Sequence, residues 1–178
     1  MNPAWDIQTG RLALSPVGWQ DLPDLRALKG DPLVYGQMLG GVRNPGQVAA
    51  ELAQDIVFWA ARGFGMWLVR SVPDKTAVGM TGLHDRLDGR GIALRFAFRP
   101  EVRGHGLARE AAGAALRFAH YQARLERVVA VAREANIASR TVLGAIGMRP
   151  CGTFDRDGSP MLVFESLATP PPPADAWR

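Results

Sequence analysis

The sequence predicts an α+β fold: a mixed, mostly antiparallel sheet of about seven strands with about four helices on its faces. Its periodic segments follow the order strand, two helices, three strands, helix, strand, helix and two strands. The three strands in succession are separated by short turns, which is typical of antiparallel pairs. A strand–helix–strand unit then lies at the centre. The order shows no repeat and no second domain, so residues 1–167 are expected to form one domain.

The amino-terminal third predicts one strand and two helices. Residues 11–15 alternate as a strand with one buried face does. Residues 21–28 predict a short helix, because leucines recur there at helical spacing. Asn44 and Pro45 open a longer helix that ends at Gly63. Its apolar stripe is formed by Val48, Leu52, Ile56, Trp59 and Ala60.

The central third carries the three successive strands and the strand–helix–strand unit. Residues 65–70 and 77–83 predict a strand pair around a proline-containing turn, and residues 92–99 a third strand. An amphipathic helix follows over residues 106–122. Valines then make residues 127–133 a buried strand.

The carboxy-terminal part predicts one more helix and two closing strands. Asn136 caps this helix and Gly147 ends it. Strands are expected near residues 152–155 and 161–166, and residues 168–178 form a proline-rich tail that should be mobile. The exposed last strand is a place where two subunits of a homodimer could pair.

Composition narrows the class of protein. The 178 residues contain no long apolar run and no amino-terminal signal pattern, so neither a membrane span nor secretion is expected. A single cysteine, Cys151, excludes an internal disulfide, which favours the cytoplasm, and no ligand cluster surrounds it, so no metal site is expected. The net charge of +4 comes from scattered arginines, which argues against a nucleic-acid partner.

The most informative segment is the glycine-bearing turn between residues 96 and 108. Glycines let the backbone approach a ligand closely, and the free N–H groups of a helix start attract phosphate. A Walker loop would need Lys and Ser or Thr where Leu107 and Ala108 stand. A dinucleotide fingerprint would need a glycine at Arg109. Both patterns are therefore excluded.

The remaining pattern, Arg103-x-x-Gly106-x-Ala108, resembles the acyl-CoA pyrophosphate signature of the GCN5-related N-acetyltransferase (GNAT) superfamily. Asn136-x-x-Ser139 follows in the order typical of that family. Residues 9–12 and 79–83 are similar to the branch of the RimJ/RimL-type ribosomal-protein acetyltransferases. The resemblance covers roughly residues 9 to 166 and implies the GNAT fold, whose sheet is splayed at its centre.

The resemblance also implies the donor site. Acetyl-CoA would lie in the splay between strands 92–99 and 127–133, with its pantetheine arm along the backbone of Phe96 and Phe98. Asn136 would bind this arm, and Ser139 would donate a proton to the sulfur; we treat these two as the candidate catalytic residues. The pyrophosphate would rest on main-chain N–H groups of Arg103, Gly104, His105, Gly106, Leu107 and Ala108.

The usual acid and base of the superfamily are missing from this sequence. Leu143 stands where many members carry the tyrosine acid, and Ala93 and Leu94 occupy the region of the usual glutamate. Water, His84 or Asp85 could remove the amine proton, or no base is used; His84 and Asp85 are equally consistent with a simple turn. Two aromatic residues near the expected acceptor site, Trp59 and Trp67, either line it or belong to the core.

The sequence thus predicts an acetyl-CoA-dependent N-acetyltransferase whose acceptor is a primary amine, either a protein or peptide N-terminus or a small molecule. The alternative is a non-catalytic domain that binds or senses acyl-CoA, because acid and base are both absent. The sequence does not identify the acceptor.

Overall fold

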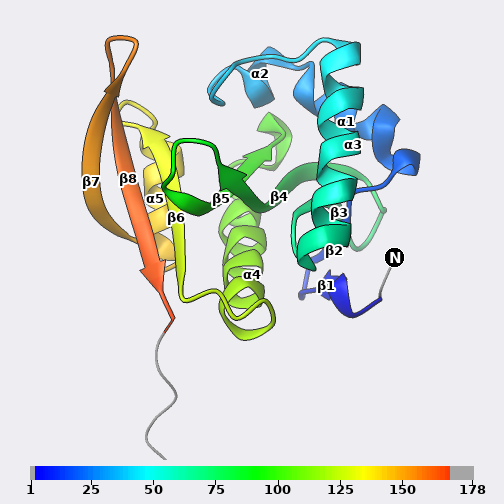
Figure 1. The fold of residues 1–178 in the computed structure, drawn as a ribbon. Helices are drawn as coiled ribbons and strands as arrows, with labels where there is room; N and C mark the ends of the chain where they lie inside the picture. The colour runs from blue at the N-terminus through cyan, green and yellow to red at the C-terminus, as the bar shows by residue number, and fades with distance from the viewer. Residues whose placement is uncertain (1–2, 169–178) are drawn as a thin grey trace, which may run out of the picture.

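The computed structural model describes residues 3–168 and contains one eight-stranded sheet in the order β1-β2-β3-β4-β5-β6-β8-β7 (Figure 1). Every neighbouring pair is antiparallel except β5 and β6, which run parallel. The strands are β1 (Ile7–Gln8), β2 (Leu12–Pro16), β3 (Met66–Ser71), β4 (Ala77–Arg86), β5 (Gly91–Phe98), β6 (Arg127–Arg133), β7 (Arg149–Arg156) and β8 (Ser159–Leu167).

Helices cover both faces of this sheet, and the core is divided accordingly. One cluster joins the apolar face of α4 and Leu143 of α5 to the sheet. The second joins α1, α2 and most of α3 to the opposite face. In Figure 1, α1–α3 and the β7–β8 hairpin stand on opposite sides of β5 and β6. The helices are α1 (Leu22–Lys29), α2 (Pro32–Tyr35), α3 (Pro45–Arg62), α4 (Leu107–Tyr121) and α5 (Ile137–Ala145).

The sheet is splayed at its centre. β4 and β5 pair along eight residue positions from Gly79↔Phe98 to Arg86↔Gly91. In contrast, β5 and β6 are paired only at Ala93↔Val129, so the two strands separate beyond this point. The later half of β5 therefore has a ladder partner on one side only, which leaves main-chain groups for another partner.

The structure corrects four expectations about individual elements. The two-residue strand β1 and the single-turn helix α2 are too short to produce a periodic pattern. β4 continues through Arg86, so His84 and Asp85 lie in a strand and not in a loop. The last strand, β8, lies inside the sheet between β6 and β7, and β7 is the edge strand at this end of the sheet.

No helix among residues 3–168 is long and apolar enough to cross a membrane. The tail is described only as far as Ala168, so the expectation of mobility for the remaining tail residues lies outside the described residues.

Candidate functional site

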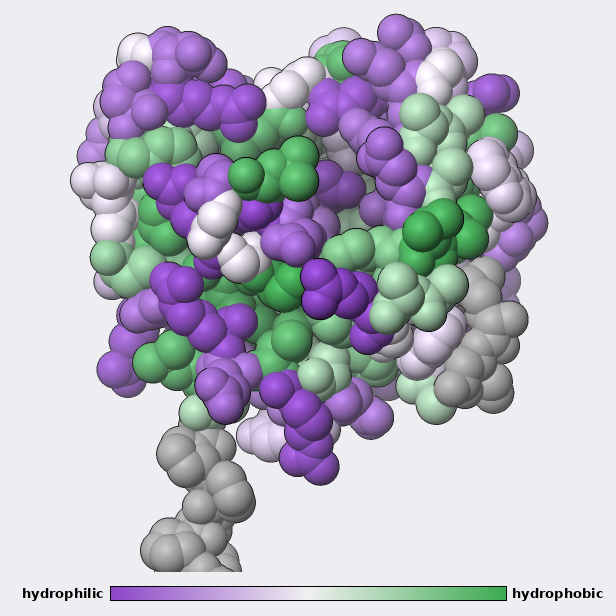
Figure 2. All heavy atoms as spheres, in the orientation of Figure 1, coloured by the Kyte–Doolittle hydropathy of each residue, from purple (hydrophilic) through white to green (hydrophobic). Residues whose placement is uncertain are grey.

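A cavity of about 100 Å³ opens where β5 and β6 separate. The loop after α2 closes one side of it, and the start of α5 closes the other. In the space-filling view of Figure 2, a notch lies between two hydrophilic rims at the same end of the sheet. The lining residues are Gln37, Met38, Leu39, His84, Arg86, Ala93, Leu94, Arg95, Phe96, Ala130, Val131, Ala132, Arg133, Asn136, Ser139, Leu143 and Met161.

The glycine-bearing turn leads from the end of β5 into α4. Gly104 and Gly106 adopt φ angles of +80° and +74°, in the left-handed region that favours glycine. Gly106 is the N-cap of α4 and provides no side-chain cap, whereas Asn44 and Asn136 cap α3 and α5 with their side chains. The first N–H groups of α4 are therefore open to an anion.

Space around the two glycines is open on the protein side. A Cβ at Gly104 would meet no atom within 4 Å, and one at Gly106 would meet only the Arg11 Nη2 atom at 3.8 Å. Leu107 and Ala108 begin α4 and are half-buried, and His105 is exposed. Arg103 is exposed, and its Nη2 donates to the carbonyl of Leu33 at 2.5 Å. This guanidinium therefore ties the turn to α2.

A clasp made by Thr9, Arg11 and Glu110 holds the turn from behind. Arg11 Nη1 donates to the carbonyl of His105 at 2.9 Å, and Arg11 Nε donates to Glu110 Oε2 at 2.7 Å. Thr9 Oγ1 donates to Glu110 Oε1 at 2.5 Å. Burial alone would raise the pKa of Glu110, but these hydrogen bonds outweigh it and hold the pKa below its ordinary value. Sequence reasoning noticed residues 9–12 as a family pattern but gave them no role.

The start of α5 brings both candidate catalytic residues to the cavity. Asn136 Oδ1 accepts the hydrogen bond of the Ser139 main-chain N–H at 3.0 Å, which caps the helix. The Asn136 amide nitrogen and the Ser139 hydroxyl have no partner within the described part of the chain. Leu143, one turn further along, is buried against the same cavity. The Asn136 amide and the Ser139 hydroxyl thus reach the cavity beside the apolar side chain of Leu143.

His84 lies on β4 and lines the same cavity. Its Nδ1 is 3.0 Å from the carbonyl oxygen of Ala93. Because a carbonyl only accepts hydrogen bonds, Nδ1 carries the proton and Nε2 is left as an acceptor. Burial, assisted by the positive charge of Arg95, lowers the pKa of His84 to about 3. His84 is therefore a neutral hydrogen-bond acceptor at neutral pH.

Three other candidate residues lie away from the cavity. Asp85 is on the next position of β4, is 46% exposed and pairs with Arg62 at 3.5 Å. Trp59 and Trp67 are 2% and 0% exposed and lie in the core, in edge-to-face contact with each other. Their indole nitrogens donate to the carbonyls of Met66 and Trp5. Of the two alternatives that the sequence left open for these tryptophans, the structure thus supports the core.

Of the two phenylalanines of β5, Phe96 lines the cavity and Phe98 does not. Both pack against the core cluster that contains α4. Their side chains thus point away from the acceptor face, and what they offer a donor is main chain.

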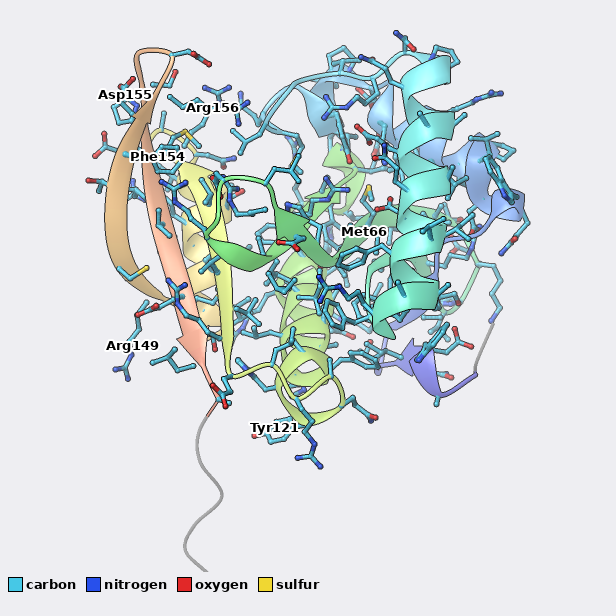
Figure 3. The ribbon with its side chains drawn as sticks, in the orientation of Figure 1. Met66, Tyr121, Arg149, Phe154, Asp155 and Arg156 are labelled. Atoms are coloured by element: carbon cyan, nitrogen blue, oxygen red, sulfur yellow. The ribbon has the colours of Figure 1, made fainter. Side chains whose placement is uncertain are left out.

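A buried ion network lies behind Arg95. Lys29 is 0% exposed, and its Nζ donates to Glu51 Oε2 at 2.7 Å. Asp55 stands 4.0 Å from both Lys29 Nζ and Arg95 Nη2, and its Oδ2 atom is buried without a hydrogen bond. Burial raises the pKa of Asp55 despite these two cations. Figure 3 labels Met66, whose Sδ accepts a hydrogen bond from Arg95 Nε at 3.4 Å.

A match to a known protein family identifies the family of this chain. The model of the acetyltransferase (GNAT) domain matches residues 11–149, which include the clasp residue Arg11, the glycine turn and the start of α5. The chain belongs to the GNAT acetyltransferase family. The splayed sheet and the uncapped α4 agree with the sequence-based expectation of this fold.

Solved structures of GNAT proteins share the fold. A GnaT-family acetyltransferase from Bordetella pertussis is 23% identical, with a TM-score of 0.80 over 90% of this chain and 98% of that chain. RimL, the ribosomal L7/L12 alpha-N-protein acetyltransferase in complex with coenzyme A, is 15% identical, with a TM-score of 0.75 over 92% and 98%. Spermidine N-acetyltransferase SpeG from Vibrio cholerae is 14% identical, with a TM-score of 0.70 over 89% and 95%.

Proposed function

We propose that this GNAT domain transfers the acetyl group of acetyl-CoA to a primary amine by direct attack of the amine on the thioester. Three features support it: the uncapped start of α4, the later half of β5, which lacks a second ladder partner, and the Ser139 hydroxyl at the cavity. A donor with a pyrophosphate, an amide-rich arm and a thioester has groups that match these three places in that order.

The residues of the cavity would then divide the work as follows. The Asn136 amide donates to the pantetheine arm while its oxygen continues to cap α5. The neutral Nε2 of His84 accepts a hydrogen bond from the attacking amine and so orients it. The nitrogen–carbon bond forms as the carbon–sulfur bond breaks, the amine proton leaves to water, and Ser139 protonates the departing sulfur before solvent restores its hydroxyl.

Steady-state release of CoA from acetyl-CoA, measured with a panel of amines, tests this function. Turnover with at least one amine, reduced in the Ser139→Ala variant, is the expected result. The non-catalytic sensor is the second candidate, because Leu143 and Ala93 occupy cavity positions where an acid and a base would serve. Tight acetyl-CoA binding without turnover on any amine would favour the sensor.

We further propose a cytoplasmic location and a homodimer that pairs through the exposed edge strand β7, which replaces β8 as the available edge. Sedimentation equilibrium checks the dimer: a Thr153→Pro change in β7 should shift it to monomer, since proline removes a main-chain donor. An unchanged mass would contradict pairing through this edge.

A further inference from the structure

The face of the sheet that the acceptor would approach carries arginines on three adjacent strands. Side chains alternate along a strand, and Leu83, Leu94 and Ala132 belong to the core cluster of α4. Their neighbours Arg95 and Arg133, together with Arg86, therefore lie on the opposite face, and all three line the cavity. They come from β5, β6 and β4 respectively.

These arginines differ in how well the protein neutralises them. Arg86 is paired with Asp88 at 2.5 Å and is 11% exposed. Among the described residues, the one carboxylate paired with Arg95 is that of Asp55 at 4.0 Å, which Lys29 approaches equally closely. The guanidinium of Arg133 has no hydrogen bond or ion pair within residues 3–168. Arg95 and Arg133 thus face the cavity with positive charges that the protein does not fully neutralise.

Negative groups do not balance this charge. None of the described residues that line the cavity is an aspartate or glutamate. His84 is neutral, Asp85 is directed to Arg62, and Asp55 is behind Arg95. A polycationic acceptor would bring further positive charge into this cavity. An acidic acceptor would instead supply the negative charge that Arg95 and Arg133 lack.

We propose that the acceptor carries a carboxylate close to its primary amine and that Arg95 and Arg133 bind this carboxylate. The proposal rests on the proposed acetyl transfer and names the class of acceptor for the same site. Guanidinium groups suit this role because their planar donors match a carboxylate. The same chemistry occurs in free amino acids and at acidic peptide N-termini.

The proposal also accounts for the missing base. A positive environment disfavours a second positive charge, so it lowers the pKa of a bound ammonium group. The bound acceptor then loses its proton to water without a carboxylate base. The arginines that hold the acidic group would in this way supply the neutral amine that attacks.

Matched acceptors test the class. We would compare kcat/KM for β-alanine with β-alaninamide, for the peptide amide Ser-Asp-Gly-Gly with Ser-Asn-Gly-Gly, and for spermidine. In at least one pair the acidic member should be better by about tenfold or more, near the lower end of what a buried charge pair contributes, and which pair responds distinguishes an amino acid from a peptide. Equal or better turnover of amides and spermidine overturns the proposal while leaving acetyl transfer intact.

Variants locate the effect. Arg133→Gln should lower kcat/KM for the acidic acceptor by about tenfold more than for its amide, which loses only the effect of the arginine on the amine, and should leave the KM for acetyl-CoA unchanged, with partial recovery in Arg133→Lys. Arg117→Gln removes the same charge from the exposed side of α4, outside the cavity, and serves as the control. Loss of acetyl-CoA affinity in Arg133→Gln would assign this arginine to the donor and overturn the proposal.

Isothermal titration calorimetry measures acceptor binding directly, so it tests the carboxylate site even if the protein turns over none of these amines. With the protein saturated with CoA, the acidic member of a pair should bind more tightly than the amide, and Arg133→Gln should remove the difference. Equal affinities in this experiment refute the carboxylate site. Failure of turnover alone would instead count against the proposed function.

Discussion

Gly106→Ala is the substitution that best separates the donor site from the fold. Gly106 has φ +74°, and an added Cβ would meet only Arg11 Nη2 at 3.8 Å, so the protein has room for it. The cost to folding is conformational, about 1–2 kcal/mol for an L-residue in the left-handed region, or about 2–8 °C in Tm for a domain of this size. Valine would add the strain of a β-branched side chain and confuse the two effects.

The effect on the donor should be larger. The Cβ would stand beside the open N–H groups at the start of α4, where the pyrophosphate is proposed to lie. Loss of one hydrogen bond to a charged group costs about 1.5–3 kcal/mol, which corresponds to about a 10- to 150-fold weaker Kd. Isothermal titration with acetyl-CoA measures this, and thermal unfolding measures the strain.

Gly158→Ala is a matched control. Gly158 also has φ +74° and open space around its Cβ position, but it lies in the turn between β7 and β8. Both variants should lose similar stability, and only Gly106→Ala should lose acetyl-CoA affinity. Equal affinities in the two variants would refute the main-chain phosphate site.

Three further substitutions test the acid, the clasp and the buried histidine. Ser139→Ala should lower kcat by about 100-fold, as expected for a lost proton donor, with an unchanged KM for acetyl-CoA; a full-rate variant would remove Ser139 from the mechanism. Glu110→Gln should cost about 0.5–1 kcal/mol, since the Arg11 side of the pair is largely exposed, and should weaken acetyl-CoA binding by loosening the turn. The pKa of Glu110 is lowered in the folded protein, so its ionised carboxylate stabilises the fold above the ordinary pKa of a glutamate. This stabilisation is lost as pH falls through the lowered pKa, so the Tm values of wild type and variant should converge in acid. The folded protein keeps His84 neutral until about pH 3, whereas the unfolded chain protonates it near pH 6.5. As pH falls from about 6.5 to about 3, the free energy of unfolding should therefore decrease by up to about 1.4 kcal/mol per pH unit. The His84→Gln variant should show a shallower acid slope in urea titrations, and identical slopes would contradict the buried neutral imidazole.

The local backbone of the expected donor turn and the cap of α5 were predictable from the sequence because their determinants are local. Glycines such as Gly104 and Gly106 in a turn predict positive φ angles, which the structure has. Asn136 lies three residues before Ser139 at a helix start, where an N-cap is expected. Such signals depend on residues adjacent in the chain. The boundaries of α3 and α4 followed for the same reason, from apolar periodicity and terminal residues.

The remaining features depend on contacts between distant residues. The bond from Arg11 to the His105 carbonyl spans 94 positions, and no local pattern signals it. His84 looked like a loop residue because Asp85 and Gly89 suggest a turn, but pairing with β5 extends β4 past both His84 and Asp85. Trp59 and Trp67 are aromatic near the expected acceptor site, yet packing against Phe118 of α4 places them in the core. Tertiary pairing decided each of these cases.

The sheet consists of two sets of strands, β1–β5 and β6–β8–β7, which are joined by the single residue pair Ala93↔Val129. The chain crosses between them through α4, whose first turn is also the proposed phosphate site. Amide hydrogens along the free edge of β5 should therefore exchange quickly with solvent and become protected when a donor lies against that edge. The donor would then be more than a reactant. By bridging the gap, it would act as a removable ninth strand that ties the two sets of strands together more firmly and raises the free energy of unfolding of the sheet.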